Sequence, residues 1–274
     1  MLQLVLLQAD RVTNNRQRRK MSIPAGLYVA EFGPQPSATS SAHRVLLVHG
    51  GASSHRMYMD VVPILTARGY KLIIPDLPGH GRSARTVQPF SFCSAISLLK
   101  QIIQAEKHSN MSTALTLVGI SLGGQVVLQL LSECADIVDN AVVSGASIHP
   151  PDEQASWEMP YLPTEDERWM QILQEDIEAM GMENTKAVQN CSFEFTFDVA
   201  ASAEGRLPPT LVLVGENDIA MAKRDSEELV RILKKGNERS RKVVLDGAWH
   251  NHSVDVPGRF ADVIDNWAKQ GKSM

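Results

Sequence analysis

Ser121 lies in a sequence context that could hold a reactive hydroxyl. Gly119 and Gly123 flank it in the spacing G-x-S-x-G, which is typical of a strained turn with no room for side chains beside a nucleophile. The apolar run at 115–118 predicts a strand buried on both faces, and apolar residues at helical spacing over 126–131 predict a helix. The hydroxyl would then lie at a helix N-terminus, where partial positive charge favours a developing anion. A serine in an ordinary strand-to-helix turn gives the same short pattern, so other residues must decide.

Two more side chains follow predicted strands and could act together with Ser121. Asp218 comes after the apolar run TLVLVG, and His250 comes after KVVL. A serine hydroxyl becomes a nucleophile when an imidazole removes its proton, and a buried carboxylate orients that imidazole. The carboxyl ends of parallel strands meet at one sheet edge, so all three could converge there. We therefore predict a triad with Ser121 as nucleophile, His250 as base and Asp218 as the orienting acid.

Each of these partners has a nearby rival of the same chemical type. Glu216 competes with Asp218 for the role of the acid, and His252 competes with His250 for the role of the base. If the strand continues through Glu216, that side chain faces the other way, because alternate residues of a strand point to opposite faces. The preference for His250 rests on the family resemblance described below.

The distribution of apolar runs predicts one α/β domain. Strands are expected at 26–33 and 44–51 and in the runs that begin at 71, 115, 140, 210 and 241. Helices are expected over about 59–70, 91–107, 122–131, 223–235 and 258–268. This alternation favours right-handed crossovers and a mainly parallel central sheet with helices on both faces.

Residues 149–207 interrupt the alternation with prolines, acidic residues and aromatics. We interpret them as a lid or cap insertion over the carboxyl edge of the sheet, where open α/β sheets bind ligands. An ordinary helical layer is the alternative. The α/β core then comprises 23–148 and 208–274, and residues 1–22 form an N-terminal extension outside the fold.

Several stretches resemble the α/β-hydrolase superfamily from about residue 26 to the end. They are VLLVHGG, DLPGHGRS, GISLGG and GEND, together with the placement of His250 ahead of Asp255 and Pro257. The chain order Ser, Asp, His is the order of that superfamily. Within it, the sequence is similar to the branch of monoacylglycerol lipases and lysophospholipases. Haloalkane dehalogenases and epoxide hydrolases are disfavoured, because those relatives attack with a carboxylate where this chain has Ser121.

The resemblance also assigns an oxyanion hole and sorts the histidines. It implies that the backbone amides of Gly51 and Leu122 hold the oxyanion, an arrangement that typically lowers a barrier by about 3 kcal/mol. It makes His250 the base, since the spacing to Pro257 matches the family. His80 is then a structural loop histidine, and we interpret His49 as supporting the turn that follows it.

Composition and charge exclude several classes of protein. The chain has 274 residues, a formal net charge of -4 and a pI near 6.1, and it has no nucleic-acid-binding motif. No apolar stretch approaches the roughly 18 residues of a membrane span. Cys93, Cys134 and Cys191 lack disulfide or zinc spacing, so we expect them reduced and buried. We expect a soluble cytoplasmic protein without metal or cofactor. A mitochondrial location is the alternative, because arginines follow the apolar residues at the start of the sequence.

The combined prediction is a serine hydrolase that cleaves a monoacylglycerol-like or other small acyl ester through an acyl-enzyme. The same triad could hydrolyse a lactone, a thioester, an amide or a carbon-carbon bond. A non-enzymatic ligand receptor on a hydrolase fold is the alternative from another class. The sequence leaves the oligomeric state open.

Overall fold

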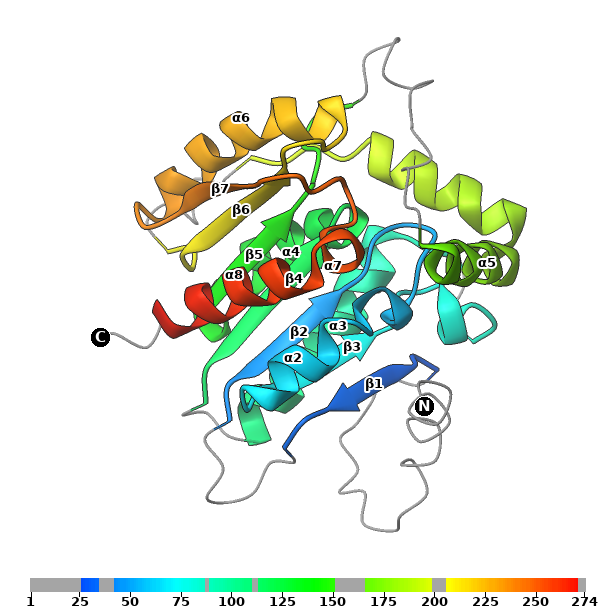
Figure 1. Ribbon diagram of the computed structural model, residues 1–274, viewed down its shortest axis with the longest axis horizontal. Helices are drawn as coiled ribbons and strands as arrows, with labels where there is room; N and C mark the ends of the chain where they lie inside the picture. Colours follow the sequence, from blue (N-terminus) through cyan, green and yellow to red (C-terminus); the bar gives the residue numbers. More distant parts are fainter. Residues whose placement is uncertain are drawn as a thin grey trace.

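The computed structural model describes residues 26–34, 42–86, 89–109, 113–150, 166–198 and 206–270. Seven strands form one sheet in the order β1-β3-β2-β4-β5-β6-β7 (Figure 1). They are β1 (Val29–Phe32), β2 (Arg44–Val48), β3 (Lys71–Pro75), β4 (Leu115–Ile120), β5 (Asn140–Ser144), β6 (Thr210–Gly215) and β7 (Arg241–Leu245). Only β1 pairs antiparallel with its neighbour, and the others run parallel. The predicted α/β fold with a mainly parallel sheet is confirmed.

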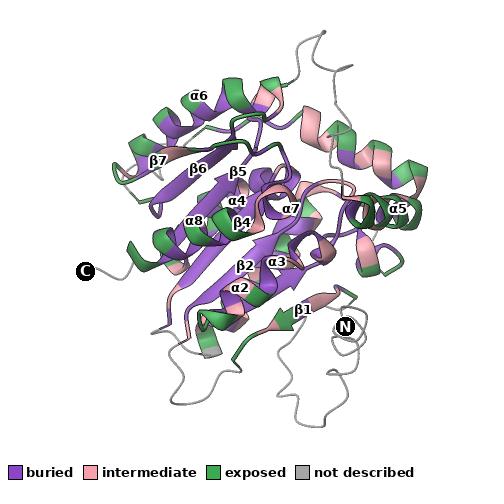
Figure 2. Cartoon of the chain, in the orientation of Figure 1, coloured by how far each residue is buried: buried purple, intermediate pink, exposed green. Residues whose placement is uncertain are grey.

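The central strands are apolar throughout because both faces of the sheet are covered. In β2, Leu46 and Val48 pack into the core on one face, and Val45 and Leu47 pack into the core on the other. Figure 2 shows the central strands buried along their length. Successive side chains of a strand point to opposite faces, so an unbroken apolar run fits a two-sided core.

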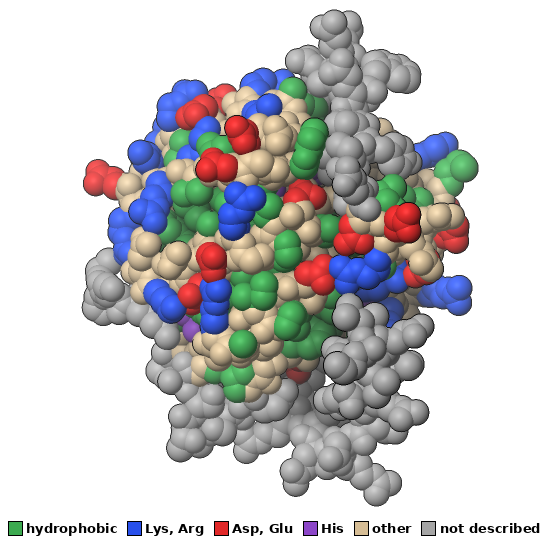
Figure 3. Space-filling view, in the orientation of Figure 1, with side chains coloured by type: hydrophobic (Ala, Val, Ile, Leu, Met, Phe, Trp, Pro, Cys, Tyr) green, Lys and Arg blue, Asp and Glu red, His purple; other side chains and the backbone are tan. Residues whose placement is uncertain are grey.

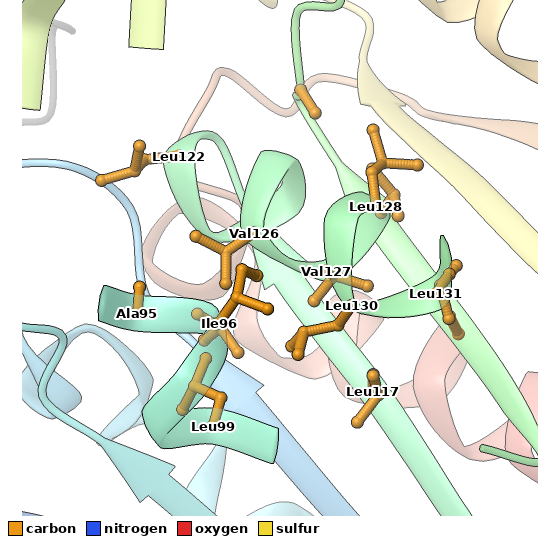
Figure 4. Packing of buried hydrophobic residues seen from close by; sticks show 14 of the residues in the cluster. Ala95, Ile96, Leu99, Leu117, Leu122, Val126, Val127, Leu128, Leu130 and Leu131 are labelled. Carbon is orange, nitrogen blue, oxygen red and sulfur yellow. The ribbon is translucent and has the colours of Figure 1, made fainter. Parts of the chain in front are cut away.

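Helices form a layer on each face of the sheet. The helices of the described chain are α2 (Val62–Ala67), α3 (Phe92–Ser109), α4 (Leu122–Cys134), α5 (Glu167–Phe193), α6 (Ala220–Gly236), α7 (His252–Asp255) and α8 (Pro257–Gln270). Helices α3, α4 and α6 pack on one face, and α2 and α8 pack on the other. Figure 4 shows the valines and leucines of α4 packed among Ile96 and Leu99 of α3 and Leu117 of β4. This packing fixes the helix that begins just after Ser121.

Some local predictions need correction. The helix expected over about 59–70 spans only Val62–Ala67, because residues 59–61 continue the tight turns that begin at His55, with the N–H of Val61 donating to the carbonyl of Tyr58 at 2.9 Å. The short helix α7 was not predicted, since a four-residue segment has no periodicity to reveal it. The cysteines are free, as expected, but only Cys134 is buried and Cys93 is exposed. The expected extension at 1–22 lies outside the described residues.

The surface of the described chain carries both charge signs. Figure 3 shows lysines and arginines interspersed with aspartates and glutamates on one face of the molecule. Among the described residues, no helix is both long enough and apolar enough to cross a membrane.

Candidate active site

The turn at Ser121 is as strained as the glycine pattern predicts. Its backbone has φ 55° and ψ −120°, a region that a non-glycine residue rarely adopts and that costs about 1–3 kcal/mol. A Cβ at Gly119 would lie 2.2 Å from the carbonyl oxygen of Gly123, and a Cβ at Gly123 would lie 2.1 Å from that of Val48. Only hydrogen fits at either position, so the two glycines let β2, β4 and α4 meet at this point.

Contacts on both sides of the turn hold Ser121 in place. Its backbone N–H donates to the carbonyl oxygen of Ser144 at the end of β5, at 2.8 Å, and its own carbonyl accepts from the N–H of Gln125 at 3.1 Å. Helix α4 begins at the next residue, Leu122. The first N–H groups of a helix lack partners within that helix and favour negative charge nearby. The Ser121 hydroxyl therefore lies where an anion is stabilised.

Asp218 and His250 form the pair that the sequence predicts. Asp218 follows β6, and its Oδ1 accepts from His250 Nδ1 at 2.6 Å and from the N–H of Ile219 at 2.8 Å. Its Oδ2 accepts from the N–H of Gly215 at 3.1 Å. Both residues are buried, with 4% of Asp218 and 8% of His250 exposed. Because Nδ1 of His250 is engaged with the carboxylate, Nε2 is the ring nitrogen left for proton exchange.

The carboxyl group of Asp218 stays ionised in spite of its burial. Burial raises its pKa, but the hydrogen bonds and charges of His250 and His252 outweigh burial and hold the pKa far below the ordinary value for an aspartate. The ionised carboxylate therefore stabilises the folded state at every pH above the ordinary pKa of an aspartate. This stabilisation is lost as the pH falls toward the lowered pKa.

The rival acid lies elsewhere. Glu216 is exposed, and its Oε2 accepts from the backbone N–H of Gly247 at 2.7 Å. Strand alternation does not account for this placement, because β6 ends at Gly215 and Glu216 lies in the turn that follows it.

The rival base is much closer to the triad than the sequence suggested. His252 is fully buried, and its Nε2 lies 3.3 Å from Oδ2 of Asp218. Both histidines thus reach the same carboxylate from different sides. Among the described residues that line the cavity at this site, His250 is present and His252 is not.

The two positions predicted for the oxyanion hole are neighbours in space. A Cβ on Gly51 would lie 3.9 Å from Cβ of Leu122, and both residues line the same cavity as Ser121. Ala52, just after Gly51, has φ 57° and is with Ser121 the only non-glycine residue of the described chain at positive φ. Such local strain clusters at functional sites.

Two more histidines support loops in the way the sequence analysis expected. His49 accepts from the N–H of Leu77 at 2.9 Å, and its other ring nitrogen donates to the carbonyl of Gly50 at 2.8 Å. His80 is fully buried, with its ring against those of His49 and Phe90. Burial and the nearby His49 lower the pKa of His80 to about 3, so it stays neutral.

A cavity of about 420 Å³ opens beside Ser121 and His250. Its walls are mainly apolar and come largely from α5. The apolar lining includes Trp169, Leu173, Ile177, Met180, Val188 and Phe193 of α5 and Met57, Ile219 and Met221 of the core. Trp169 and Phe193 belong to the aromatics of the predicted insertion at 149–207, whereas the core residues of the lining were not predicted. Ile219 could have been found, since it directly follows Asp218. Phe195 and Phe197 pack in the core instead.

A comparison with known protein families matches residues 45–263 to the model of the alpha/beta hydrolase family. The chain belongs to the alpha/beta hydrolase family. The match spans β3 to β7, nearly all of β2, and the residues Ser121, Asp218 and His250. In this member of the family, Ser121, Asp218 and His250 follow strands β4, β6 and β7 of one sheet.

The individual relatives match only part of the chain or have low sequence identity. An AB hydrolase superfamily protein of Gibberella zeae is 35% identical over 107 residues, which is 39% of this chain and 36% of that protein. A haloalkane dehalogenase of Psychrobacter cryohalolentis is 33% identical over 97 residues, or 35% of this chain and 31% of that protein. The chain thus spans about a third of the length of these curated relatives. The solved monoacylglycerol lipase of Paleococcus ferrophilus has a TM-score of 0.63 at 21% identity and covers 90% of this chain and 99% of its own.

The crowding around Ser121 in this hydrolase gives a testable prediction. We expect Gly123→Ala to lower the free energy of unfolding by about 2–3 kcal/mol, because the new methyl group would overlap the carbonyl oxygen of Val48. Gly258→Ala is the matched control, since nothing lies within 4 Å of a Cβ there, and we expect a change within about 0.5 kcal/mol. Urea denaturation measures both. Equal stability of the two variants would contradict the steric account of the glycine pattern.

Proposed function

We propose that this hydrolase cleaves a carboxylic ester, of a monoacylglycerol-like or other small acyl type, through an acyl-enzyme. Ser121 is the nucleophile, His250 the general base and Asp218 the group that orients His250. The observation that carries the proposal is the 2.6 Å pair of Asp218 and His250, with His250 facing the same cavity as the strained Ser121 turn.

The proposed reaction has two halves. Oγ of Ser121 attacks the ester carbonyl carbon while its proton passes to Nε2 of His250, and the carbonyl oxygen becomes an oxyanion held by the amides of Gly51 and Leu122. The carbon-oxygen bond to the alcohol then breaks, and His250 returns the proton to the leaving alcohol. In the second half a water molecule gives its proton to His250 and attacks the acyl-enzyme. The bond between the acyl carbon and Oγ of Ser121 then breaks, His250 returns its proton to Oγ, and the carboxylic acid leaves.

The lining of the cavity favours an uncharged acyl group. Among the described residues that line it there is no aspartate, glutamate, lysine or arginine. A charged group entering such a space loses hydration without meeting a carboxylate, an ammonium or a guanidinium, whereas an alkyl chain gains about 0.8 kcal/mol per buried methylene. A neutral acyl ester therefore fits better than a substrate with a charged acyl end. A lactone, thioester, amide or carbon-carbon bond with an equally apolar acyl part remains the alternative substrate.

The dehalogenase relative represents a different chemistry. We disfavour that chemistry for this chain, because a carboxylate nucleophile is expected at the position that Ser121 occupies. A ligand receptor on the same fold is disfavoured by a different observation. A binding protein gains nothing from holding Ser121 in a backbone conformation that costs about 1–3 kcal/mol.

We further propose that α5 is the lid of this site. The helix is interrupted at Gly181, which has φ 73° and ψ 162°. Its first half supplies cavity walls on one side and ion pairs on the other. Asp176, almost fully buried, accepts from the Ser54 hydroxyl at 2.7 Å and pairs with Arg56 at 2.5 Å. These contacts would hold the half before Gly181 closed over the cavity.

The nucleophile assignment is tested by covalent labelling. We expect Ser121→Ala to lose labelling by a fluorophosphonate probe and to lower ester hydrolysis by at least about 10⁴-fold, because no other group can form the acyl-enzyme. Ser132→Ala, an exposed serine of the same stretch, is the matched control and should label like the wild type. Full hydrolysis by Ser121→Ala, measured with p-nitrophenyl esters from acetate to palmitate, would overturn the proposed function.

Two isosteric substitutions test whether Asp218, and not Glu216, orients His250. We expect Asp218→Asn to lower kcat by about 10³–10⁴-fold, because the amide favours the wrong imidazole tautomer of His250. Glu216→Gln should leave kcat within about twofold, since that side chain bonds only the backbone of an exposed turn. Steady-state kinetics on one ester suffices. A crippled Glu216→Gln enzyme with an active Asp218→Asn enzyme would reverse the assignment.

Substitution of Asp176 tests whether its ion pair with Arg56 keeps α5 closed over the cavity. We expect Asp176→Asn to raise hydrolysis of dissolved ester relative to micellar ester by about tenfold, because a charge-assisted bond of about 1.5 kcal/mol no longer keeps α5 closed. Glu175→Gln is the control, since Glu175 meets Arg56 at the half-exposed surface. An unchanged ratio in Asp176→Asn, with melting temperature and secondary structure retained, would argue against a gating role of α5.

A further inference from the structure

His252 is a buried histidine that the proposed reaction does not use. It lies at the start of α7 with no exposed surface, and one edge of its ring faces β5 while the other faces the loop after β6. Its Nδ1 is hydrogen-bonded to Oγ of Ser144, and its Nε2 lies 3.3 Å from Oδ2 of Asp218. His252 is thus a fully buried imidazole between a hydroxyl and the carboxylate of the candidate triad, and this placement indicates a role in the site.

The contacts of His252 connect both ends of the candidate triad. The backbone carbonyl of Ser144 accepts from the N–H of Ser121, and the hydroxyl of the same Ser144 meets His252. His252 faces Oδ2 of Asp218, and Oδ1 of Asp218 holds His250. The ends of β4, β5 and β6 and the segment after β7 are thus joined through one ring.

The chemistry of the neighbours assigns the proton positions on the ring. An ionised carboxylate can only accept, so the ring edge that faces Asp218 carries the hydrogen on Nε2. Nδ1 then accepts the hydroxyl proton of Ser144. Nε2 of His252 has no aligned hydrogen-bond partner among the described residues, and a buried donor of this kind is rarely left unsatisfied. The carboxylate 3.3 Å away is the acceptor it can reach by a small rotation.

We propose that neutral His252 is a positioning residue of the triad, acting on His250 only through Asp218. This inference rests on the proposed function. By donating toward Oδ2, His252 fixes the carboxylate plane, so Oδ1 stays directed at Nδ1 of His250. It also draws part of the negative charge toward itself, so less of that charge stabilises the protonated form of His250.

The titratable groups around His252 agree with a neutral ring. Asp218 faces it from the loop after β6, His250 shares that carboxylate, and Asp255 lies on the same short helix. Burial raises the pKa of Asp255, and its Oδ2 already accepts from the backbone N–H of Trp249. On the side of α8, His252 meets the apolar ring of Phe260. Among the described residues named here, Asp218 is the anion that faces the ring, and it already accepts hydrogen bonds from His250 and from two backbone N–H groups.

The test compares two substitutions at this position. His252→Leu removes the donor, whereas the side-chain amide of His252→Gln can place an N–H near the position of Nε2. With the donor lost, Asp218 keeps its full charge for His250, which then holds its proton to higher pH. We expect the acid limb of the pH profile for fluorophosphonate labelling of Ser121 to move up by about half a pH unit or more in His252→Leu. We expect a plateau rate about tenfold lower, a smaller loss than that of a general base.

His252→Gln should restore the midpoint of the wild-type profile and most of the plateau rate. A role in packing alone would lower the melting temperature without moving the midpoint. An unchanged or downward-shifted midpoint in His252→Leu would therefore overturn the proposal for His252. The proposed function would stand in that case, because Ser121 would still be labelled. A wild-type enzyme that does not label at Ser121 would overturn both.

A measurement on the wild-type protein covers the case in which His252→Leu does not fold. Nitrogen-15 NMR of labelled histidines, assigned with His252→Gln, reports the protonation of each ring nitrogen. We expect His252 as the neutral tautomer with the proton on Nε2 throughout the active pH range. A proton on Nδ1 alone, or a doubly protonated ring in that range, would overturn the proposal.

Discussion

The close approach of three backbone segments at Ser121 is the constraint on which the site depends. Gly119 and Gly123 have no side chain because carbonyl oxygens occupy the space that a Cβ would need. The flanking strands are fully buried, so the turn cannot relax by moving outward. The strain at Ser121 is therefore held by the packing of the sheet and α4, and it keeps the hydroxyl at the start of a helix.

The carboxylate of Asp218 is the electrostatic counterpart of that turn. Backbone N–H groups of Gly215 and Ile219 and the ring of His250 donate to it, so a buried negative charge remains ionised. A charge held in this way is costly to move or to neutralise. It therefore fixes the position of His250, and with it the nitrogen that faces the cavity. In our proposal His252 completes this set of donors on the side away from the cavity.

Helix α5 makes apolar contacts on one side and charged contacts on the other. The cavity wall is built from Trp169, Leu173 and Ile177, whereas Asp176 and Glu175 meet Arg56 beside the 3₁₀ turn. An apolar wall excludes water from the chemistry, and ion pairs at its edge can break without exposing the sheet core. The same helix can therefore shape the acyl site and, in our proposal, open it. The interruption at Gly181 divides the helix at a point where nothing lies within 4 Å of the position that a Cβ would take.

Local rules in the sequence were enough for the fold and for the turn at Ser121. Continuous apolar runs predicted buried parallel strands, and the glycine spacing predicted the turn, because both depend on sterics or periodicity within a few residues. Positions after two strands predicted Asp218 and His250, but the choice of His250 over His252 depended on the family resemblance. Only the tertiary structure showed that His252 shares Asp218 with His250 and which side chains of α5 line the cavity. Those facts depend on where segments far apart in the chain meet, and a lone histidine or an isolated helix carries no local signal of its distant neighbours.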